Sequence, residues 1–185
     1  MDPRDLDIAA LRRALRSRLG SLGTPLQILA EDMLGEDDAR IDWLAMEPSG
    51  RVALALLDGE GGGEALLARG LAQRAWVHAR IGDWRKLAPH LQARSDLRPR
   101  LLLLAPDFSR IVRLAAREAD AEGVHLARVH WVSAGGSFGV EVEPIQLPPA
   151  PVVEAAPESP PLASVFRSGL GERDFGANGG GQQGS

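Results

Sequence analysis

The feature that most constrains the fold is the run from Arg100 to Ala105, which is apolar at every position after Arg100 and is bounded by Pro99 and Pro106. A run of this length without polar alternation is typical of a strand that is buried on both faces of a sheet. Residues Phe108 to Ala121 have the periodicity of an amphipathic helix, and residues Val124 to Val132 have the character of a further strand. Strand, helix and strand in this order predict a crossover unit whose two strands are parallel.

Two more apolar runs, Ile41 to Met46 and Val52 to Leu57, flank the turn residues Pro48-Ser49-Gly50. Strand-length runs on either side of such a turn predict a β-hairpin. Residues Leu26 to Ala30 have the character of an additional strand just before it. We therefore expect three antiparallel strands ahead of the crossover unit.

The remaining periodic segments predict two helices and one edge strand. Asp5 to Leu19 is amphipathic, and Glu64 to Leu91 has helical spacing with an expected interruption near Gly82. Phe138 to Glu143 is expected to add a last strand at an edge of the sheet. Together these elements predict an α/β (α+β) fold in which helices flank a mixed central β-sheet.

Composition indicates one domain and a tail. The chain has 185 residues, of which 44% are hydrophobic, which is enough for one buried core. Residues 1–146 are assigned to the α/β domain, and residues 147–185, rich in Pro and Gly, are expected to be disordered. Within this tail, the apolar side chains of 162–175 could form a docking motif for a protein partner, or the tail could be inert.

The charge balance and the residue types exclude several classes of function. There are 21 basic and 25 acidic residues, so binding to nucleic acid must depend on a local patch of charge. Cysteine is absent, which excludes disulfides, thiol catalysis and cysteine-ligated metals. No segment has the length and apolar character of a membrane span, so no membrane association and a cytoplasmic location are expected.

Asp42 is the only charged residue within the two apolar hairpin runs, and its position resembles an active-site pattern. From residue 26 to residue 143, the order of elements is similar to the restriction-endonuclease-like PD-(D/E)xK superfamily, in particular its DNA-repair-endonuclease and junction-resolvase branches. Members carry an aspartate on one strand, and an acid, one apolar residue and a lysine on the next. Here Leu56 stands at the position of the second acid and Asp58 at that of the lysine. The resemblance implies a nuclease-like fold with a degenerate active-site motif.

Leu56 and Asp58 lack the chemistry that the residues of that motif provide. Magnesium binds oxygen ligands, and leucine at position 56 supplies none. An aspartate at position 58 repels the phosphate that a lysine would attract. The main interpretation is a catalytically inactive module that binds nucleic acid or a protein and needs no cofactor.

Two alternatives remain open. A metal-dependent endonuclease would use Asp42 and Asp58 as catalytic residues, with Asp42, Asp58 and Glu60 holding Mg²⁺ or Mn²⁺. A structural interaction protein would have no affinity for nucleic acid at all.

Three arginines at helical spacing are candidates for nucleic-acid binding. Arg110, Arg113 and Arg117 lie at i, i+3 and i+7 of the predicted helix, with further arginines just upstream at 94, 98 and 100. Guanidinium groups match the geometry of phosphate oxygens, so this face could contact the DNA backbone. It could equally be an ordinary solvated helix face, neutralised by the acids at 118, 120 and 122. The residues indicate no oligomeric state.

Overall fold

A computed structural model describes residues 8–22, 24–59, 63–134 and 137–149. The strands are β1 (Gln27–Leu34), β2 (Arg40–Met46), β3 (Val52–Leu57), β4 (Arg100–Ala105), β5 (Val124–Ala134) and β6 (Ser137–Ile145). The α-helices are α1 (Ile8–Arg16), α2 (Glu64–Leu87) and α3 (Arg110–Asp120). Short 3-10 turns are η2 (Leu19–Leu22), η3 (Glu36–Asp38) and η4 (Pro89–Leu91).

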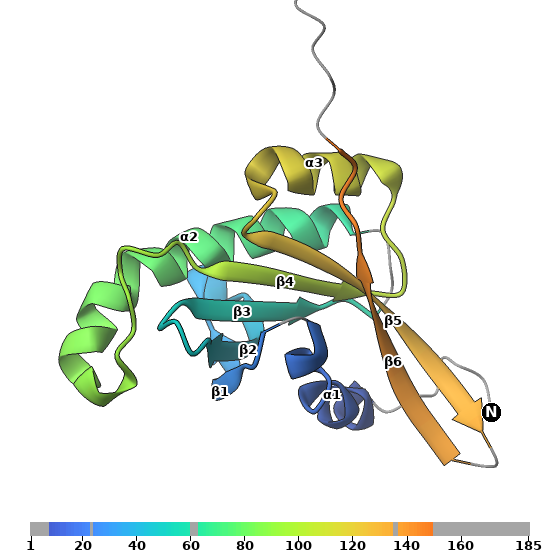
Figure 1. Cartoon of the computed structure of the whole chain (residues 1–185), viewed down its shortest axis with the longest axis horizontal. Helices are drawn as coiled ribbons and strands as arrows, with labels where there is room; N and C mark the ends of the chain where they lie inside the picture. The colour runs from blue at the N-terminus through green and yellow to red at the C-terminus, as the bar shows by residue number, and fades with distance from the viewer. Residues whose placement is uncertain (1–7, 23, 60–62, 135–136, 150–185) are drawn as a thin grey trace, which may run out of the picture. The chain divides into compact units, whose positions relative to one another are not determined.

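The strands form one six-stranded mixed sheet in which they lie in sequence order, β1 to β6. β1, β2 and β3 are antiparallel, β3, β4 and β5 are parallel, and β6 is antiparallel to β5. Each of the two parallel steps contains a helix, α2 or α3, as Figure 1 shows. The predicted α/β class, the three antiparallel strands and the parallel crossover unit are therefore confirmed.

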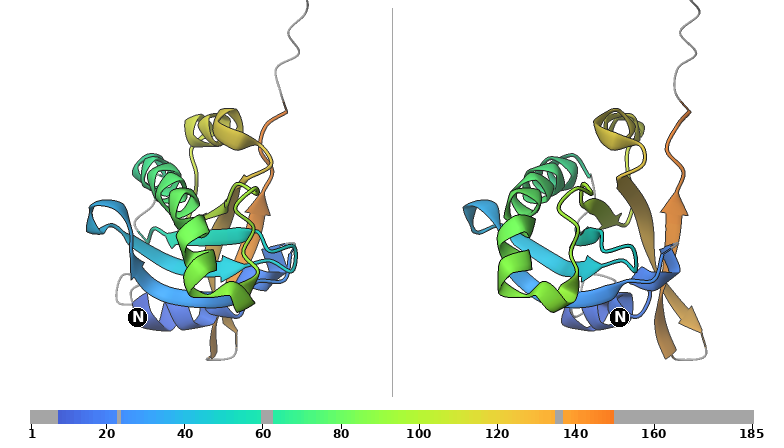
Figure 2. Two further views of the ribbon diagram at one scale, coloured as in Figure 1. Left: turned by 90° about the vertical axis from the view of Figure 1, so that its left-hand side faces the viewer. Right: turned by 60° about the vertical axis from the view of Figure 1, so that its left-hand side comes forward.

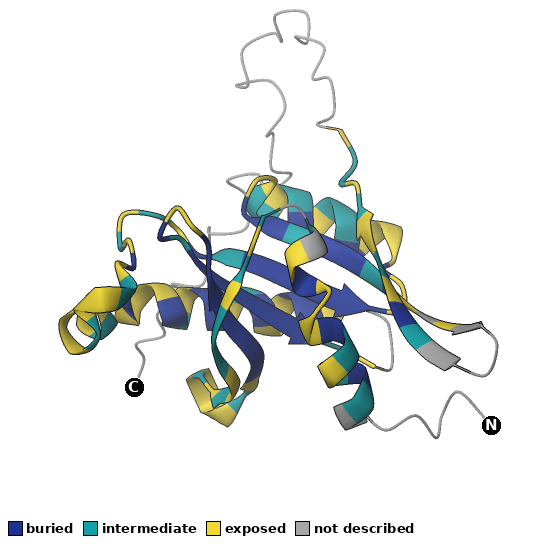
Figure 3. Cartoon of the chain, turned by 60° about the horizontal axis from the view of Figure 1, so that its bottom comes forward, coloured by how far each residue is buried: buried dark blue, intermediate teal, exposed yellow. Residues whose placement is uncertain are grey.

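Helices cover both faces of the sheet. α2 and α3 pack on one face, and α1 packs on the opposite face (Figure 2). Successive side chains of β4 point to opposite faces of the sheet. Leu101 and Leu103 belong to the apolar cluster beneath α2 and α3, whereas Leu102 and Leu104 belong to the cluster beneath α1. The central strands are accordingly buried along their length (Figure 3). This confirms that the apolar run at β4 is buried on both faces.

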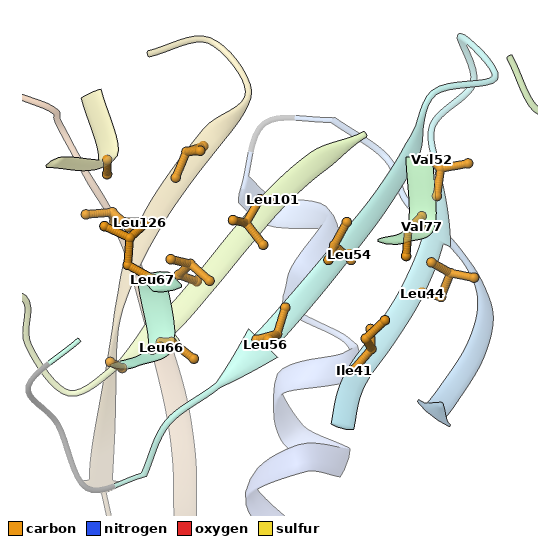
Figure 4. Packing of buried hydrophobic residues seen from close by; sticks show 14 of the residues in the cluster. Ile41, Leu44, Val52, Leu54, Leu56, Leu66, Leu67, Val77, Leu101 and Leu126 are labelled. Atoms are coloured by element: carbon orange, nitrogen blue, oxygen red, sulfur yellow. The ribbon is translucent and has the colours of Figure 1, made fainter. Parts of the chain in front are cut away.

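α2 approaches the sheet closely because Gly70 has no side chain. A Cβ at this position would lie 2.8 Å from Leu103 Cδ2, which is closer than real contacts allow. Leu66 and Leu67, one turn earlier, pack beside Leu56 and Leu101 in the same cluster (Figure 4). Leu56 is therefore a core residue beneath α2.

The structure differs from the sequence-based expectation within α2. The helix is continuous from Glu64 to Leu87, without the interruption that we predicted near Gly82. A glycine in a helix costs only about 1 kcal/mol relative to alanine. Ile81, the preceding residue, is fully buried against the sheet, and this packing offsets that cost.

The described residues end at Pro149. Leu147, which was assigned to the predicted tail, is partly buried and packs against the cluster beneath α2 and α3. The docking segment at 162–175 lies outside the described residues, and the boundary at 146 stays a prediction. None of the helices in the described ranges combines the length and the apolar character needed to cross a membrane.

Candidate functional site

β2 and β3 separate at the end of their shared ladder. Their pairing runs from Met46 and Val52 to Trp43 and Ala55. Beyond this point, β3 continues alongside β4 as far as Leu57. The two strands of the hairpin therefore form a fork.

Asp42 lies in this fork and connects its two arms. Its Oδ2 accepts a hydrogen bond of 2.7 Å from the backbone N–H of Leu57. Its Oδ1 is paired with the guanidinium group of Arg12, which comes from α1. The residue is only 6% exposed. Both oxygens of this carboxylate are thus engaged within the protein.

Arg12 is itself held from several sides. It forms a second ion pair with Asp32 on β1, and its guanidinium carbon lies 5.7 Å from the centre of the Trp43 ring. An aromatic face attracts a cation at this range. Arg12 therefore neutralises the buried charge of Asp42 from a well-defined position.

A small pocket opens beside this ion pair, and we call it the fork pocket. Its volume is about 200 Å³, and it is lined by Leu11, Arg12, Arg40, Asp42, Leu57, Gly59 and Arg69. Arg40 and Arg69 are both exposed, unlike Arg12. Arg40 Nε lies 3.4 Å from Asp32 Oδ1, and Arg69 Nη2 donates to the Leu57 carbonyl at 3.4 Å. These long contacts leave both guanidinium groups available to a further anion.

The described donor groups do not fit a divalent cation. Asp42 is engaged through both oxygens, and Leu56 is buried in the core with no oxygen to offer. The backbone N–H of Asp58 donates to the Leu104 carbonyl at 2.9 Å, and Asp58 is not among the lining residues of the fork pocket. Across the described ranges, no three His, Asp or Glu side chains are grouped so that they could hold a metal ion. Glu60 lies outside these ranges, so the site of Asp42, Asp58 and Glu60 stays a prediction.

The three arginines of α3 differ in their surroundings. Arg110 is exposed, whereas Arg113 and Arg117 are half-buried. Arg117 is paired with Glu118 and also donates to the backbone carbonyl of Pro149. Their contact with DNA stays a prediction, and among them Arg110 is the most accessible.

Two of the upstream arginines have partners of their own. Arg100 Nε lies 2.8 Å from the buried Glu47 Oε1, and Arg94 is paired with Asp96. Arg98 is exposed and belongs to a different pocket, lined also by Arg74 and His78.

Sequence analysis identified Asp42 but missed the arginines that surround it. Arg12, Arg40 and Arg69 come from α1, β2 and α2, and no local pattern marks them as partners of one site. Arg12 is followed directly by Arg13 in an amphipathic helix, so the sequence does not single it out.

No protein-family model matches the chain, and a search of curated proteins found no match. Among solved structures, the chain matches the crystal structure of a repair endonuclease from Pyrococcus abyssi with a TM-score of 0.49 and 9% sequence identity. The match covers 67% of this chain and 47% of that chain. The chain thus matches about half the length of that endonuclease.

Proposed function

We propose that this chain is a binding module for the sugar–phosphate backbone of nucleic acid and that it does not cleave its ligand. The observation that carries the proposal is the fork pocket, where the buried Asp42 is matched by Arg12 and two more arginines stay exposed. An anionic ligand suits such a pocket better than a metal cation does.

Arg40 and Arg69 supply the contacts in this proposal. A guanidinium group presents several N–H donors in a planar fork that matches two phosphate oxygens at once. Arg40 would exchange its long contact with Asp32 for a shorter bond to phosphate. Because the chain carries a net charge of −4, this attraction is local, and we expect weak binding that is sensitive to salt.

The absence of cleavage in this proposal follows from the partners of Asp42. A metal ion at Asp42 would have to displace Arg12, whose side chain is only 15% exposed. Arg12 would then keep only the half-exposed Asp32 as a partner, and the loss of its buried partner would destabilise the folded protein. Magnesium also needs a set of oxygen ligands, and the fork pocket offers one carboxylate among three arginines.

The test is fluorescence anisotropy with labelled single-stranded and duplex DNA that carry 5′-hydroxyl ends, between about 50 mM and about 200 mM salt. Arg40→Ala and Arg69→Ala are each expected to weaken binding about tenfold, because each removes a charge-assisted contact. Each is also expected to reduce the slope of log K against log salt by roughly 0.7–0.9.

Lys86→Ala is the matched control, since Lys86 is an exposed cation on the same helix as Arg69 and is paired with the neighbouring Asp83. An equal loss of affinity in this control would assign the binding to diffuse charge and contradict the proposal. Arg110→Ala tests the face of α3 in the same assay. If neither DNA binds at the lowest salt, the chain is a structural interaction protein instead.

A further inference from the structure

A second pocket lies between α2 and the segment that precedes β4, and we call it the helix pocket. It has a volume of about 310 Å³ and is lined by Arg74, Ala75, His78 and Ala79 of α2 together with Arg98, which precedes β4. None of these residues lines the fork pocket. It is a shallow depression that is largely open to solvent. The helix pocket can therefore take a compact group.

Arg74 gives the helix pocket a fixed cation. It is 2% exposed, and its Nη1 donates to Asp120 Oδ2 at 2.9 Å. Asp120, at the end of α3, also accepts from the backbone N–H of Gly123 at 2.9 Å. A Cβ at Gly123 would lie 2.2 Å from Asp120 Oδ2, so glycine is required for this arrangement. The guanidinium group of Arg74 is thus held in place before any ligand arrives.

Arg98 adds a second positive charge to the same pocket. Burial lowers the pKa of Arg74, the charge of Arg98 lowers it further, and Asp120 opposes both effects. The lining residues of the helix pocket include no Asp or Glu side chain. The positive charges of Arg74 and Arg98 therefore repel each other, and Asp120 offsets this only at Arg74. A bound anion would relieve the repulsion between the two guanidinium groups.

The wall of the helix pocket is completed by His78. Its Nε2 lies 3.4 Å from the carbonyl oxygen of Ser95, so the ring is oriented by the segment that also carries Arg98. Arg85 Nη1 contacts the Ser95 hydroxyl at 3.3 Å, which ties the same segment to α2 a second time. These two contacts hold Arg98 near Arg74.

We infer that the helix pocket binds a phosphate monoester or inorganic phosphate through the guanidinium groups of Arg74 and Arg98. A phosphate monoester carries about 1.5 to 2 negative charges near neutral pH, which matches two cations better than a carboxylate does. Arginine also binds phosphate oxygens in a bidentate manner. This site is separate from the fork pocket, so the failure of one proposal leaves the other standing.

The first experiment is a titration of the whole chain with inorganic phosphate by isothermal calorimetry, at constant ionic strength set with chloride. We expect saturable binding that is weakened at least tenfold by Arg98→Ala. Arg98 is exposed, so this change removes the contact without creating a buried cavity. Arg94→Ala is the matched control, because Arg94 is an exposed arginine of the same segment that is paired with Asp96. The control should bind phosphate within about twofold of the unmodified chain.

Two results would overturn the inference. One is the absence of saturable binding to the unmodified chain, and the other is an equal loss of affinity in Arg98→Ala and Arg94→Ala. Arg98→Lys adds a further check: it keeps the charge but loses the planar fork, so an intermediate affinity is expected. If Arg98→Lys binds phosphate as tightly as the unmodified chain does, charge alone accounts for the affinity and the assignment to a bidentate contact is contradicted.

A second comparison identifies the source of the phosphate. Oligonucleotides of one sequence, with a 5′-phosphate or a 5′-hydroxyl end, are compared for binding to the unmodified chain. A preference for the 5′-phosphate that Arg98→Ala removes and Arg69→Ala retains would assign the helix pocket to a nucleic-acid end. Equal binding of the two ends, together with binding of inorganic phosphate, would assign it to a small phosphate ester.

Discussion

The carboxylate of Asp42 accepts a 2.7 Å hydrogen bond from the backbone N–H of Leu57, at the point where β2 and β3 separate. The Asp42 side chain thus provides an acceptor for the Leu57 N–H, which lies beyond the end of the β2–β3 pairing. The same carboxylate is paired with Arg12, so one residue links α1, β2 and β3. Asp42 is therefore a structural connection between α1 and the sheet.

Removal of this carboxylate should destabilise the protein. Asp42→Ala leaves the Leu57 N–H without its acceptor and leaves Arg12 with only its half-exposed partner Asp32, and we expect it to lower the free energy of unfolding by about 2–3 kcal/mol. Asp42→Asn keeps an acceptor for Leu57 and should have a smaller effect. Urea denaturation monitored by circular dichroism measures both. Asp83→Ala, which breaks the exposed pair with Lys86, should change stability by less than about 1 kcal/mol. Equal stabilities for Asp42→Ala and the unmodified chain would contradict this account.

Cleavage of DNA is not expected from the fork pocket. We predict that supercoiled and single-stranded DNA stay intact in Mg²⁺ or Mn²⁺, because both oxygens of Asp42 are engaged by protein donors. Nicking is scored on agarose gels beside Asp42→Asn, which reveals any contaminating nuclease. Nicking by the unmodified chain that Asp42→Asn lacks would establish the endonuclease alternative and contradict our proposed function.

Gly123 should tolerate no side chain. In Gly123→Ala the new Cβ meets Asp120 Oδ2 at 2.2 Å, so the carboxylate must move away from the buried Arg74. We expect a loss of about 2–4 kcal/mol in the free energy of unfolding, because a buried charge loses its partner. Thermal unfolding by calorimetry provides the measurement. A stability equal to that of the unmodified chain would show that Arg74 does not depend on Asp120.

Gly82→Ala should have the opposite effect. Gly82 is an exposed position inside α2, and an added Cβ would meet nothing within 4 Å. Alanine restricts the unfolded chain and favours helix, so the free energy of unfolding should rise by about 0.5–1 kcal/mol. The same calorimetric experiment measures this change. A decrease would mean that α2 needs a flexible residue at this point.

His125 should make stability depend on pH. Burial, aided by the charge of Arg100, lowers the pKa of His125 below its ordinary value of 6.5. As the pH falls below that value, the unfolded chain takes up a proton that the folded chain does not yet bind, so the folded state loses stability. The stabilising contribution is complete above pH 6.5 and is lost as the pH falls through the folded-state pKa. Urea unfolding from about pH 7 to about pH 5 should show a shallower decline for His125→Asn than for the unmodified chain. Parallel declines would contradict the assignment.

Much of the sheet could be predicted from the sequence because its signals are local. The apolar run from Arg100 to Ala105 coincides with β4, and the runs on either side of the Pro48-Ser49-Gly50 turn coincide with β2 and β3. The turn depends on Gly50, whose φ of 80° is a conformation that glycine adopts freely. Ser109 caps α3 by accepting from Val112 N at 3.3 Å, close to the predicted start of the helix. Strand length, apolar alternation and turn chemistry depend on residues that are close in the sequence, so they can be recognised before the tertiary structure is known.

Only the tertiary structure decided which charges meet. Arg12 is 30 residues from Asp42, and Arg74 is 46 residues from Asp120. The first pair nevertheless connects α1 to β2, and the second connects α2 to α3. The continuity of α2 through Gly82 was also decided by packing, since Ile81 is buried against the sheet. Hydrophobic periodicity determines which face of an element is buried, whereas an ion pair depends on the positions of two side chains in space. Those positions exist only after the helices have packed on the sheet, and for this reason the sequence by itself indicated Asp42 but not its partners.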